Sequence, residues 1–220
     1  MASAAQASRQ ARERELVAAT RALFDERGMG EAPIEEVAQA AGIARGLIYR
    51  QFSSKEELFV LTVTEYLAEM AELLQAAVEE EGTPEEQLAR CTEVFAGYCQ
   101  RYPAYLDCQM ALMRRPARDL RDAVSDAVFL RLGQGMASCL GPLAGVLRRG
   151  AEEGAFDVED PDYMANFLWT KLVGSMHFVR IRVGVREAEP GVPVLFKVSP
   201  ERVIETCVRS ALATVRAQPS

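Results

Sequence analysis

The pattern of apolar and polar residues between positions 33 and 59 predicts two short helices joined by a tight turn. Apolar residues recur three or four positions apart on either side of Gly42, and glycine accepts the left-handed backbone found where helices end. The inward positions are Ile34, Val37, Ala38 and Ala41 before the turn and Ile43, Ile48 and Phe52 after it. Helices that cross steeply come closest at Ala38, where a methyl group fits. The pattern is that of a helix-turn-helix.

The second short helix is left with a polar outer face once its apolar residues point inward. This face carries Arg45, Leu47, Tyr49, Arg50 and Gln51. Arg45 and Arg50 are planar donors that can pair with guanine edges in a major groove, and Leu47 can pack on a thymine methyl group. The alternative is that both arginines are ordinary solvated side chains and that Tyr49 belongs to the core.

A longer helix is predicted ahead of this pair. It spans about Arg9 to Arg27, places Leu16, Thr20, Leu23 and Phe24 on one face, and stops at Gly28. The first ten or so residues are small and polar and are expected to form a disordered arm. Neither short helix can bury its apolar side alone, so the three helices are expected to form one domain, residues 1–53 with the arm.

The helical pattern continues beyond Ser53 on a larger scale. Ser53 and Glu56 have the spacing of a capping box, and the helix that follows runs for roughly seven turns to near Gly82. Further helices are predicted to begin near residues 84, 104, 117, 161 and 200, with a kink or break near Pro142 and a loop over residues 187–197. We therefore expect an all-α fold of about nine helices, with residues 54–220 as a second, larger domain.

Two of these helices carry more apolar surface than one subunit can cover. The helix after Pro161 is apolar on more than one side, and the last helix has a wide apolar face from Val203 to Val215. The excess predicts a four-helix interface in a symmetric homodimer, where Gly174 and Ser175 would let the backbones approach closely.

The N-terminal residues resemble the tetracycline-repressor-like (TetR) family of bacterial transcription regulators. The resemblance rests on the whole stretch from Leu16 to Phe59: a helix ending in Phe24 and Gly28, then Ile34, Val37-Ala-x-Ala-Ala-Gly42, Gly46-x-Ile-Tyr49-x-x-Phe52 and Ser54-Lys55-Glu-x-Leu58-Phe59. It implies that Tyr49 and Lys55 grip DNA phosphates and that Arg45, Leu47 and Arg50 face base edges. The residues expected to bind DNA are Arg45, Gly46, Leu47, Tyr49, Arg50, Gln51 and Lys55.

Two features depart from the family pattern. Most relatives have Ser or Thr where this chain has Pro33, so a helix cap and a phosphate contact are missing. Ala44, Leu47 and Gln51 replace the commonest Ser, Thr and His. These differences bear on the operator sequence rather than on the mode of binding.

The net charge of −7 is unevenly distributed. Through Lys55 the chain has eight Lys and Arg against seven Asp and Glu, a net +1, so the remainder carries −8. The basic side chains of the first part include Arg9, Arg12 and Arg14, which are expected to engage phosphate.

The five cysteines are an odd number, lack a C-x-x-C pair and share the chain with a single histidine. We therefore expect buried thiols, with no structural disulfide, metal site or cofactor. The first ten residues lack the apolar stretch of a secretory signal, and no uncharged apolar run is long enough to cross a bilayer. The expected location is the cytoplasm.

Aromatic and soft residues of the second domain are candidates for a ligand cavity that suits a hydrophobic or amphipathic effector. They are Tyr98, Tyr102, Tyr105, Cys108, Met113, Phe129, Trp169 and His177. For any single one of them, core filling is an equal alternative, and His177 is more often a hydrogen-bonded interior or interface residue than a ligand contact.

The family resemblance implies a repressor that an effector releases from a pseudo-palindromic operator. Effector in the cavity would favour a dimer whose two reading helices no longer match successive major grooves. The alternatives are an activator or helical adaptor of the same fold. An enzyme is not expected, because Ser175 and His177 lack a nucleophile elbow and Gly133-x-Gly135 follows no strand.

Overall fold

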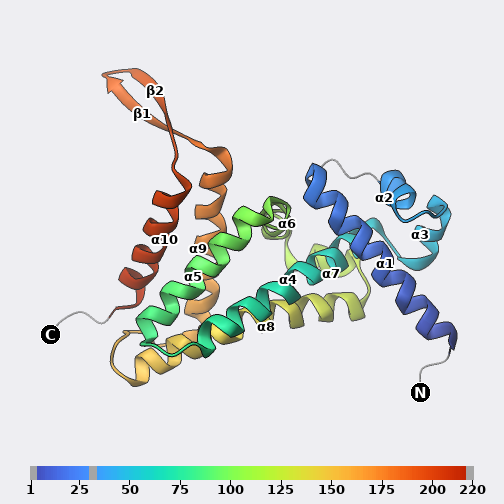
Figure 1. The fold of residues 1–220 in the computed structure, drawn as a ribbon, viewed down its shortest axis with the longest axis horizontal. Coiled ribbons are helices and arrows are strands. Elements are labelled where there is room, and N and C mark those ends of the chain that lie inside the picture. The colour runs from blue at the N-terminus through green and yellow to red at the C-terminus, as the bar shows by residue number, and fades with distance from the viewer. Residues whose placement is uncertain (1–3, 30–33, 217–220) are drawn as a thin grey trace. The chain divides into compact units, whose positions relative to one another are not determined.

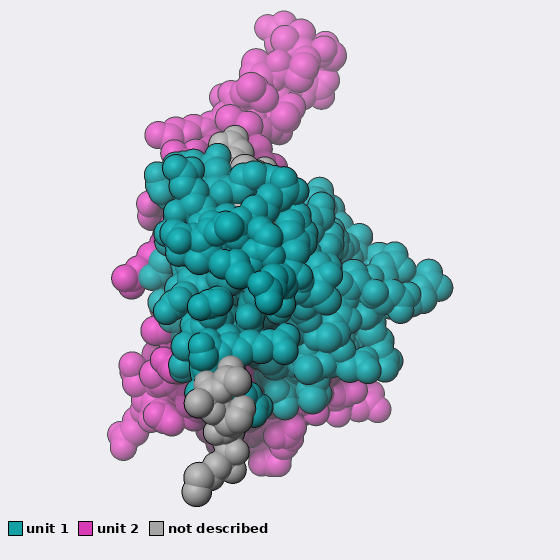
Figure 2. All heavy atoms as spheres, turned by 90° about the vertical axis from the view of Figure 1, so that its right-hand side faces the viewer, with its two compact units in different colours: residues 1–69, 102–137 teal, residues 70–101, 138–220 magenta. Residues whose placement is uncertain are grey.

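The computed structural model describes residues 4–29 and 34–216, and ten helices account for most of them (Figure 1). The expected all-α class is confirmed. The chain divides into two compact units, residues 1–69 with 102–137 and residues 70–101 with 138–220 (Figure 2). Helices α4 (Lys55–Glu79) and α8 (Asp126–Glu152) each run from one unit into the other.

The first unit begins with the three predicted helices, α1 (Ala4–Arg27), α2 (Ile34–Ala40) and α3 (Arg45–Gln51). They pack around a common core formed by Leu16, Val17, Leu23, Phe24, Val37, Ala38, Ile48 and Phe52. Gly28 and Gly42 have φ of +87° and +65°, as expected where each preceding helix ends. Pro33 and the side chain of Ile34 lie outside the described residues.

The prediction of a disordered arm is wrong for residues 4–10, which are helical. Alanine, glutamine and arginine dominate this stretch and have high helix propensity. Helix α1 therefore starts about one and a half turns earlier than the hydrophobic pattern indicated, because that pattern registers only the part of a helix that is buried.

The first unit is completed by α6 (Pro103–Met113), α7 (Ala117–Ala123) and the first part of α8. The single helix expected from 117 to 153 is two helices, which accounts for the tenth. The break is not at Pro142, which lies inside a continuous α8, but at Val124, whose backbone is extended with φ of −132°. A proline costs one backbone hydrogen bond, and a long packed helix tolerates that loss.

The capping box of α4 lies one residue later than predicted. The backbone N–H of Glu57 donates to Oγ of Ser54 at 3.0 Å, and the N–H of Ser53 donates to Oε2 of Glu57 at 2.6 Å. Ser54 is thus the capping residue, and Glu57 is the acidic residue that returns to the backbone.

The helices of the second unit are the end of α4, α5 (Pro84–Arg101), the rest of α8, α9 (Pro161–Ile181) and α10 (Pro200–Val215). Helix α10 packs on both α5 and α9. The predicted helix starts near residues 84, 161 and 200 are confirmed. Thr83, Asp160 and Ser199 cap these helices by accepting from the backbone N–H groups of Glu86, Tyr163 and Arg202. Each cap precedes a proline in the first turn.

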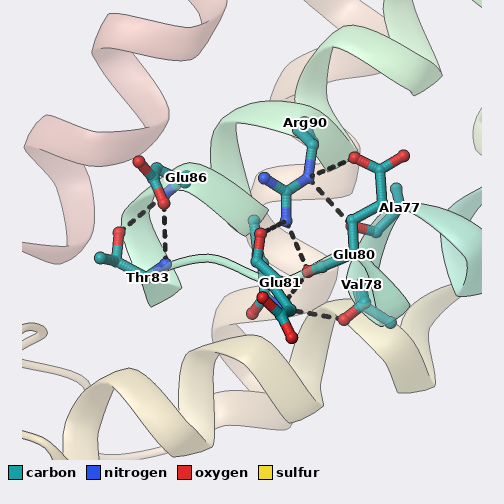
Figure 3. A network of polar contacts seen from close by, with 8 residues as sticks. Ala77, Val78, Glu80, Glu81, Thr83, Glu86 and Arg90 are labelled. Carbon is teal, nitrogen blue, oxygen red and sulfur yellow. Dashed lines mark hydrogen bonds and ion pairs between the residues drawn. The ribbon is translucent and has the colours of Figure 1, made fainter.

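Arg90 closes the corner between α4 and α5 (Figure 3). Its Nε donates to the carbonyl of Ala77 at 3.2 Å, and its Nη2 donates to the carbonyls of Glu80 and Glu81 at 2.8 and 3.3 Å. The last carbonyls of a helix have no partner within it, so this guanidinium caps the C-terminus of α4.

The loop expected at 187–197 is instead most of a β-hairpin. Strands β1 (Val183–Glu189) and β2 (Val192–Lys197) pair antiparallel, with a bulge between Glu187 and Glu189 and with Gly191 at φ of +80° in the turn. The charged residues and prolines concealed a hairpin signal, since β-branched and aromatic residues flank the Pro190-Gly191 turn. The hairpin projects beyond the ends of α9 and α10 (Figure 1).

Candidate nucleic-acid interface

Helix α3 presents an exposed row of polar side chains, as its pattern predicts. Arg45, Tyr49 and Arg50 are exposed, with Tyr49 at 51%, while Leu47 and Gln51 are half-buried. Gly46 is also exposed, and Lys55 is exposed at the first position of α4. The seven predicted residues therefore lie close together along the chain, and five of them face solvent.

Arg45 is held by two neighbours. Its Nη1 lies 2.5 Å from Oε1 of Glu35 in α2, and its Nη2 donates to the Tyr49 hydroxyl at 3.4 Å. The guanidinium also sits 5.6 Å from the centre of the Tyr49 ring. The hydrogen bond to Tyr49 and the charge of Glu35 raise the pKa of Arg45. Arg45 and Tyr49 thus form one unit on the outer face of α3.

Gln51 has a different role from the other six residues. Its Nε2 donates to the backbone carbonyl of Arg9 in α1 at 3.2 Å. This contact ties the end of α3 to α1, so Gln51 positions the helix as well as bordering its outer face.

Packing rather than capping stabilises α3. The residue before it, Ala44, has an extended backbone and makes no side-chain cap. The helix instead buries Ile48, and Phe52 follows directly with its N–H donating to the Ile48 carbonyl at 2.9 Å. The absence of a capping hydroxyl follows from the alanine at this position, which the sequence singled out as a departure.

Residues 16–61 match the model of the bacterial regulatory proteins of the tetR family. They carry a TetR-family helix-turn-helix domain. The matched residues cover the buried face of α1, the whole of α2 and α3, and the first turns of α4. The resemblance inferred from Leu16 to Phe59 is therefore confirmed.

Individual relatives agree with the assignment of this domain. The HTH-type transcriptional regulator BetI from Brucella canis is 31% identical over 78 residues, which are 36% of this chain and 39% of that protein. The chain thus spans about two fifths of the length of the curated relatives it matches.

Solved structures are similar over nearly the whole chain. A regulatory protein of the tetR family from Rhodococcus RHA1 covers 94% of this chain and 98% of its own, with a TM-score of 0.66 and 15% identity. The regulator FadR from Bacillus subtilis, solved with stearoyl-CoA, covers 91% and 97%, also with a TM-score of 0.66 and 15% identity. At such identities the likeness shows the fold alone.

The predicted ligand residues fall in both units. In the first unit, Tyr102 and Tyr105 lie with ring centres 6.2 and 5.8 Å from Tyr66 of α4, beside the fully buried Cys108. The Tyr66 hydroxyl donates to Asp25 of α1 at 2.6 Å, and burial together with this carboxylate raises the pKa of Tyr66. This cluster joins α1, α4 and α6.

Two other candidates in the first unit are less enclosed. Met113, at the end of α6, is 49% exposed. Phe129 is half-buried, and the guanidinium of Arg121 lies 6.0 Å from its ring centre. Neither side chain is part of the Tyr66 cluster.

The remaining candidates belong to the second unit. Trp169 meets Phe95 edge-on with ring centres 4.8 Å apart, and Tyr98 is buried. His177 is half-buried, and its Nδ1 has no hydrogen-bond partner within the described part of the chain.

The sequence did not single out two further features. Gln109 in α6 is only 3% exposed, and its Nε2 has no hydrogen-bond partner among the residues described. Second, a groove of about 580 Å³ lies between α9, α10 and the hairpin base, and its four charged residues are all cationic: Lys171, Arg186, Lys197 and Arg202. The signal for the groove was Lys171, a cation among the apolar residues in the middle of α9.

All five thiols are buried, as predicted. Burial raises the pKa of Cys91 and of Cys139 to about 12, so these thiols stay protonated and unreactive at neutral pH. Within residues 4–29 and 34–216, no three His, Cys, Asp or Glu side chains gather closely enough to hold a metal ion. Nor does this part of the chain contain a helix long and apolar enough to cross a membrane.

Proposed function

We propose that this chain is a transcription regulator that binds a pseudo-palindromic operator as a homodimer and leaves it when a small hydrophobic or amphipathic effector binds. The observation that carries the proposal is the exposed row of Arg45, Tyr49 and Arg50 on the second helix of a TetR-family helix-turn-helix. Such a regulator acts where the chromosome is, in the cytoplasm.

The proposed contacts divide by chemistry. Arg45 and Arg50 reach guanine edges in the major groove, and the half-buried Leu47 meets a thymine methyl group. Tyr49, Lys55 and the amide-bearing backbone at Gly46 face phosphate, and Gln51 borders the same face. Base contacts determine sequence preference, whereas phosphate contacts set register and salt dependence.

Two alanine variants test this division by fluorescence anisotropy against the promoter DNA of the adjacent gene. We expect Arg50→Ala to lose about 1–3 kcal/mol on the preferred sequence and to relax preference at one base pair. We expect Lys55→Ala to weaken binding to all DNA sequences alike and to reduce the magnitude of the slope of log K against log salt concentration by about 0.9.

Arg118→Ala is the matched control, because Arg118 is an exposed arginine of α7 in the same unit. It removes one positive charge without touching α3, so its affinity should equal that of the parent chain. A parent chain that binds no fragment of its own promoter would overturn the proposal and leave the helical adaptor as the better reading.

The homodimer is proposed to form through α9 and α10, with residues 1–53 binding DNA and 54–220 serving ligand binding and dimerisation. The support is an exposed apolar stripe on α9 made of Tyr163, Phe167, Phe178 and Ile181. Gly174 lies exposed within the stripe. Phe167→Lys should convert the dimer to a monomer, as measured by analytical ultracentrifugation. A parent chain that is monomeric would refute the interface.

The effector is proposed to contact the aromatic and soft residues of the larger domain, Tyr98, Tyr102, Tyr105, Cys108, Met113, Phe129, Trp169 and His177. The buried amide of Gln109, four residues after Tyr105 on the same helix, would give an amphipathic molecule a polar anchor. Similarity in fold to a FadR solved with stearoyl-CoA supports this class of molecule.

Native mass spectrometry of freshly purified protein tests the effector directly, because a tightly held molecule survives as a mass increment. The molecule found should bind free protein more tightly than operator-bound protein, since coupling between two ligands is reciprocal. Equal affinity for the two forms would overturn effector-controlled release.

Contacts at the start of α4 offer a route between the reading helix and the rest of the first unit. Ser54 Oγ donates to the carbonyl of Ala123 at 2.8 Å, and Ser125 Oγ donates to Oε1 of Glu57 at 2.5 Å. These bonds join the residues just after α3 to the corner between α7 and α8. Ser125→Ala should therefore weaken the effect of the effector on DNA affinity without abolishing either binding event.

A further inference from the structure

The β-hairpin has one covered face and one uncovered face. Cross-strand partners point to the same side of a sheet, so the pairs Gly184 with Phe196 and Arg186 with Val194 share one face. On this face the Phe196 ring lies directly over Gly184, where a Cβ atom would clash, and Phe196 and Arg186 line the groove against α10. This side of the hairpin is therefore partly covered by its own helices, with Phe196 still 39% exposed.

The opposite face is built from three pairs in regular register. They are Val183 with Lys197 at the base, Val185 with Leu195 in the middle, and Glu187 with Pro193 toward the tip. Val185 and Leu195 are 68% and 70% exposed. A two-stranded hairpin with a bare apolar face is marginally stable in water, so this face needs a cover.

The order of chemistry along the uncovered face is positive, apolar, negative. Lys197 marks the base, where it also borders the groove against α10, and Glu187 marks the tip side. The Val185 and Leu195 pair lies midway, two residues from each along its strand. Two copies that face each other across a two-fold axis, placed between them at the level of the middle pair, would therefore complement each other. Each cationic base would lie over the acidic end of the other hairpin, and the apolar centres would meet.

We propose that this face docks on the same face of a second copy of the chain, with the two hairpins antiparallel. The reverse arrangement, tip over tip, would bring the two Glu187 side chains to the same end and is disfavoured by repulsion. Pairing along the strand edges is also disfavoured, because Pro193 lacks an N–H and a bulge interrupts β1. The inference rests on the proposed function in one respect, which is that two copies of the chain associate.

A charge exchange between two chains tests the proposal. In Lys197→Glu both ends of the face are acidic, and in Glu187→Lys both ends are basic, so each variant should self-associate about tenfold more weakly than the parent. In a heterodimer of the two variants, the acidic ends of one hairpin lie over the basic ends of the other, so both contacts pair opposite charges. Native mass spectrometry of the full-length chains should then show heterodimers well above the statistical share.

The mixing step excludes a merely structural effect. Oε1 of Glu187 accepts from the N–H of Gly191 at 2.5 Å, so Glu187→Lys also loosens the turn, but a loosened turn is not repaired by a second chain. Arg186→Glu makes the same charge change as Lys197→Glu on the covered face, and should not favour heterodimers when mixed with Glu187→Lys. A statistical share of heterodimers for Lys197→Glu with Glu187→Lys would overturn the proposal.

The apolar centre provides a second, independent measurement. Val185→Thr combined with Leu195→Thr places a β-branched residue at both strand positions but removes the apolar contact. Its self-dissociation constant should rise by about tenfold or more, with helical circular dichroism unchanged. An unchanged constant would contradict the docking. Operator affinity is measured on the same samples, so failure of DNA binding alone would count against the proposed function and not against this contact.

Discussion

Nη1 of Arg45 lies 2.5 Å from Oε1 of Glu35, so the first residue of the reading helix is paired with a carboxylate of the helix before it. Both side chains are more than half exposed, and an exposed pair of this kind contributes little to folding. Its importance under the proposed function lies in binding, because Glu35 would compete with DNA for Arg45 and would lie close to phosphates.

Removing this competition should strengthen DNA binding. We expect Glu35→Gln to raise operator affinity about two- to tenfold at low salt, with a smaller gain at high salt, because one repulsive charge is lost and Arg45 is released. The gain should shrink in the Arg45→Ala background, where only the loss of the repulsive charge remains. Anisotropy titrations of the four proteins of this cycle measure the coupling, and a loss of affinity in Glu35→Gln would mean that Glu35 orients Arg45 for DNA instead.

The stability of the first unit should depend on pH through Glu57. Burial alone would raise the pKa of this carboxyl, but hydrogen bonds from Ser125 and Ser53 outweigh it and the pKa is lowered. A lowered folded pKa contributes stability that is present above the unfolded value near 4.5 and is lost as the pH falls through the folded pKa. Glu57→Gln should lower the free energy of unfolding by about 1–2 kcal/mol at pH 7 and by progressively less below pH 4.5.

Urea unfolding at several pH values measures this difference. Glu56→Gln is the control, since Glu56 is adjacent in α4 and lies 3.9 Å from Lys55 in a pair at the surface. Its cost should be small at every pH. A Glu57→Gln penalty that does not shrink in acid would contradict the assigned role of the ionised carboxylate.

The corner between α4 and α5 should depend on Arg90. We expect Arg90→Met to lower the free energy of unfolding by about 1–3 kcal/mol, because the carbonyls of Ala77, Glu80 and Glu81 lose a charged donor while the aliphatic stem is retained. Arg148→Met is the comparison, since Arg148 makes one long surface contact with Asp162 at 3.7 Å and should cost under about 0.5 kcal/mol. Thermal or urea denaturation measures both, and equal costs would show that the cap is dispensable.

The thiols should react with Ellman's reagent in a set order. Burial holds the pKa of Cys91 and of Cys139 near 12, and it also raises those of Cys99 and Cys108, so these four should react only on unfolding. Cys207 lines the groove beside α9, and although burial raises its pKa, Ser175 and Lys171 oppose that shift. It should react first, and Cys207→Ser should abolish the early phase. An early phase that persists in this variant would place another thiol at the surface.

Local patterns predicted the helix-turn-helix because each of its signals acts over a few residues. Gly42 has the positive φ that the turn requires, and Val37, Ala38, Ile48 and Phe52 are buried at the spacing that places them on one side. The caps at Thr83, Asp160 and Ser199 were predictable for the same reason, since a cap is a contact over three residues.

Features that depend on distant partners were not predictable from the pattern. Helix α7 ends at Val124, next to Ser125, whose hydroxyl donates a hydrogen bond to Glu57, 68 residues away. The hairpin depends on the pairing of Val185 with Leu195 and on the packing of the Phe196 ring over Gly184. The pairing of Arg45 with Glu35 likewise needs two helices to cross.

The sequence by itself thus determined the helical class, the helix-turn-helix and the identity of the exposed side chains of α3, because periodicity and caps are local features of the chain. Only the tertiary structure decided which of these side chains are already engaged, where the long helices break, and that the segment after α9 forms a hairpin with one bare face. Those outcomes depend on contacts between residues far apart in the chain, and a local sequence pattern does not specify which distant residue becomes a neighbour after folding.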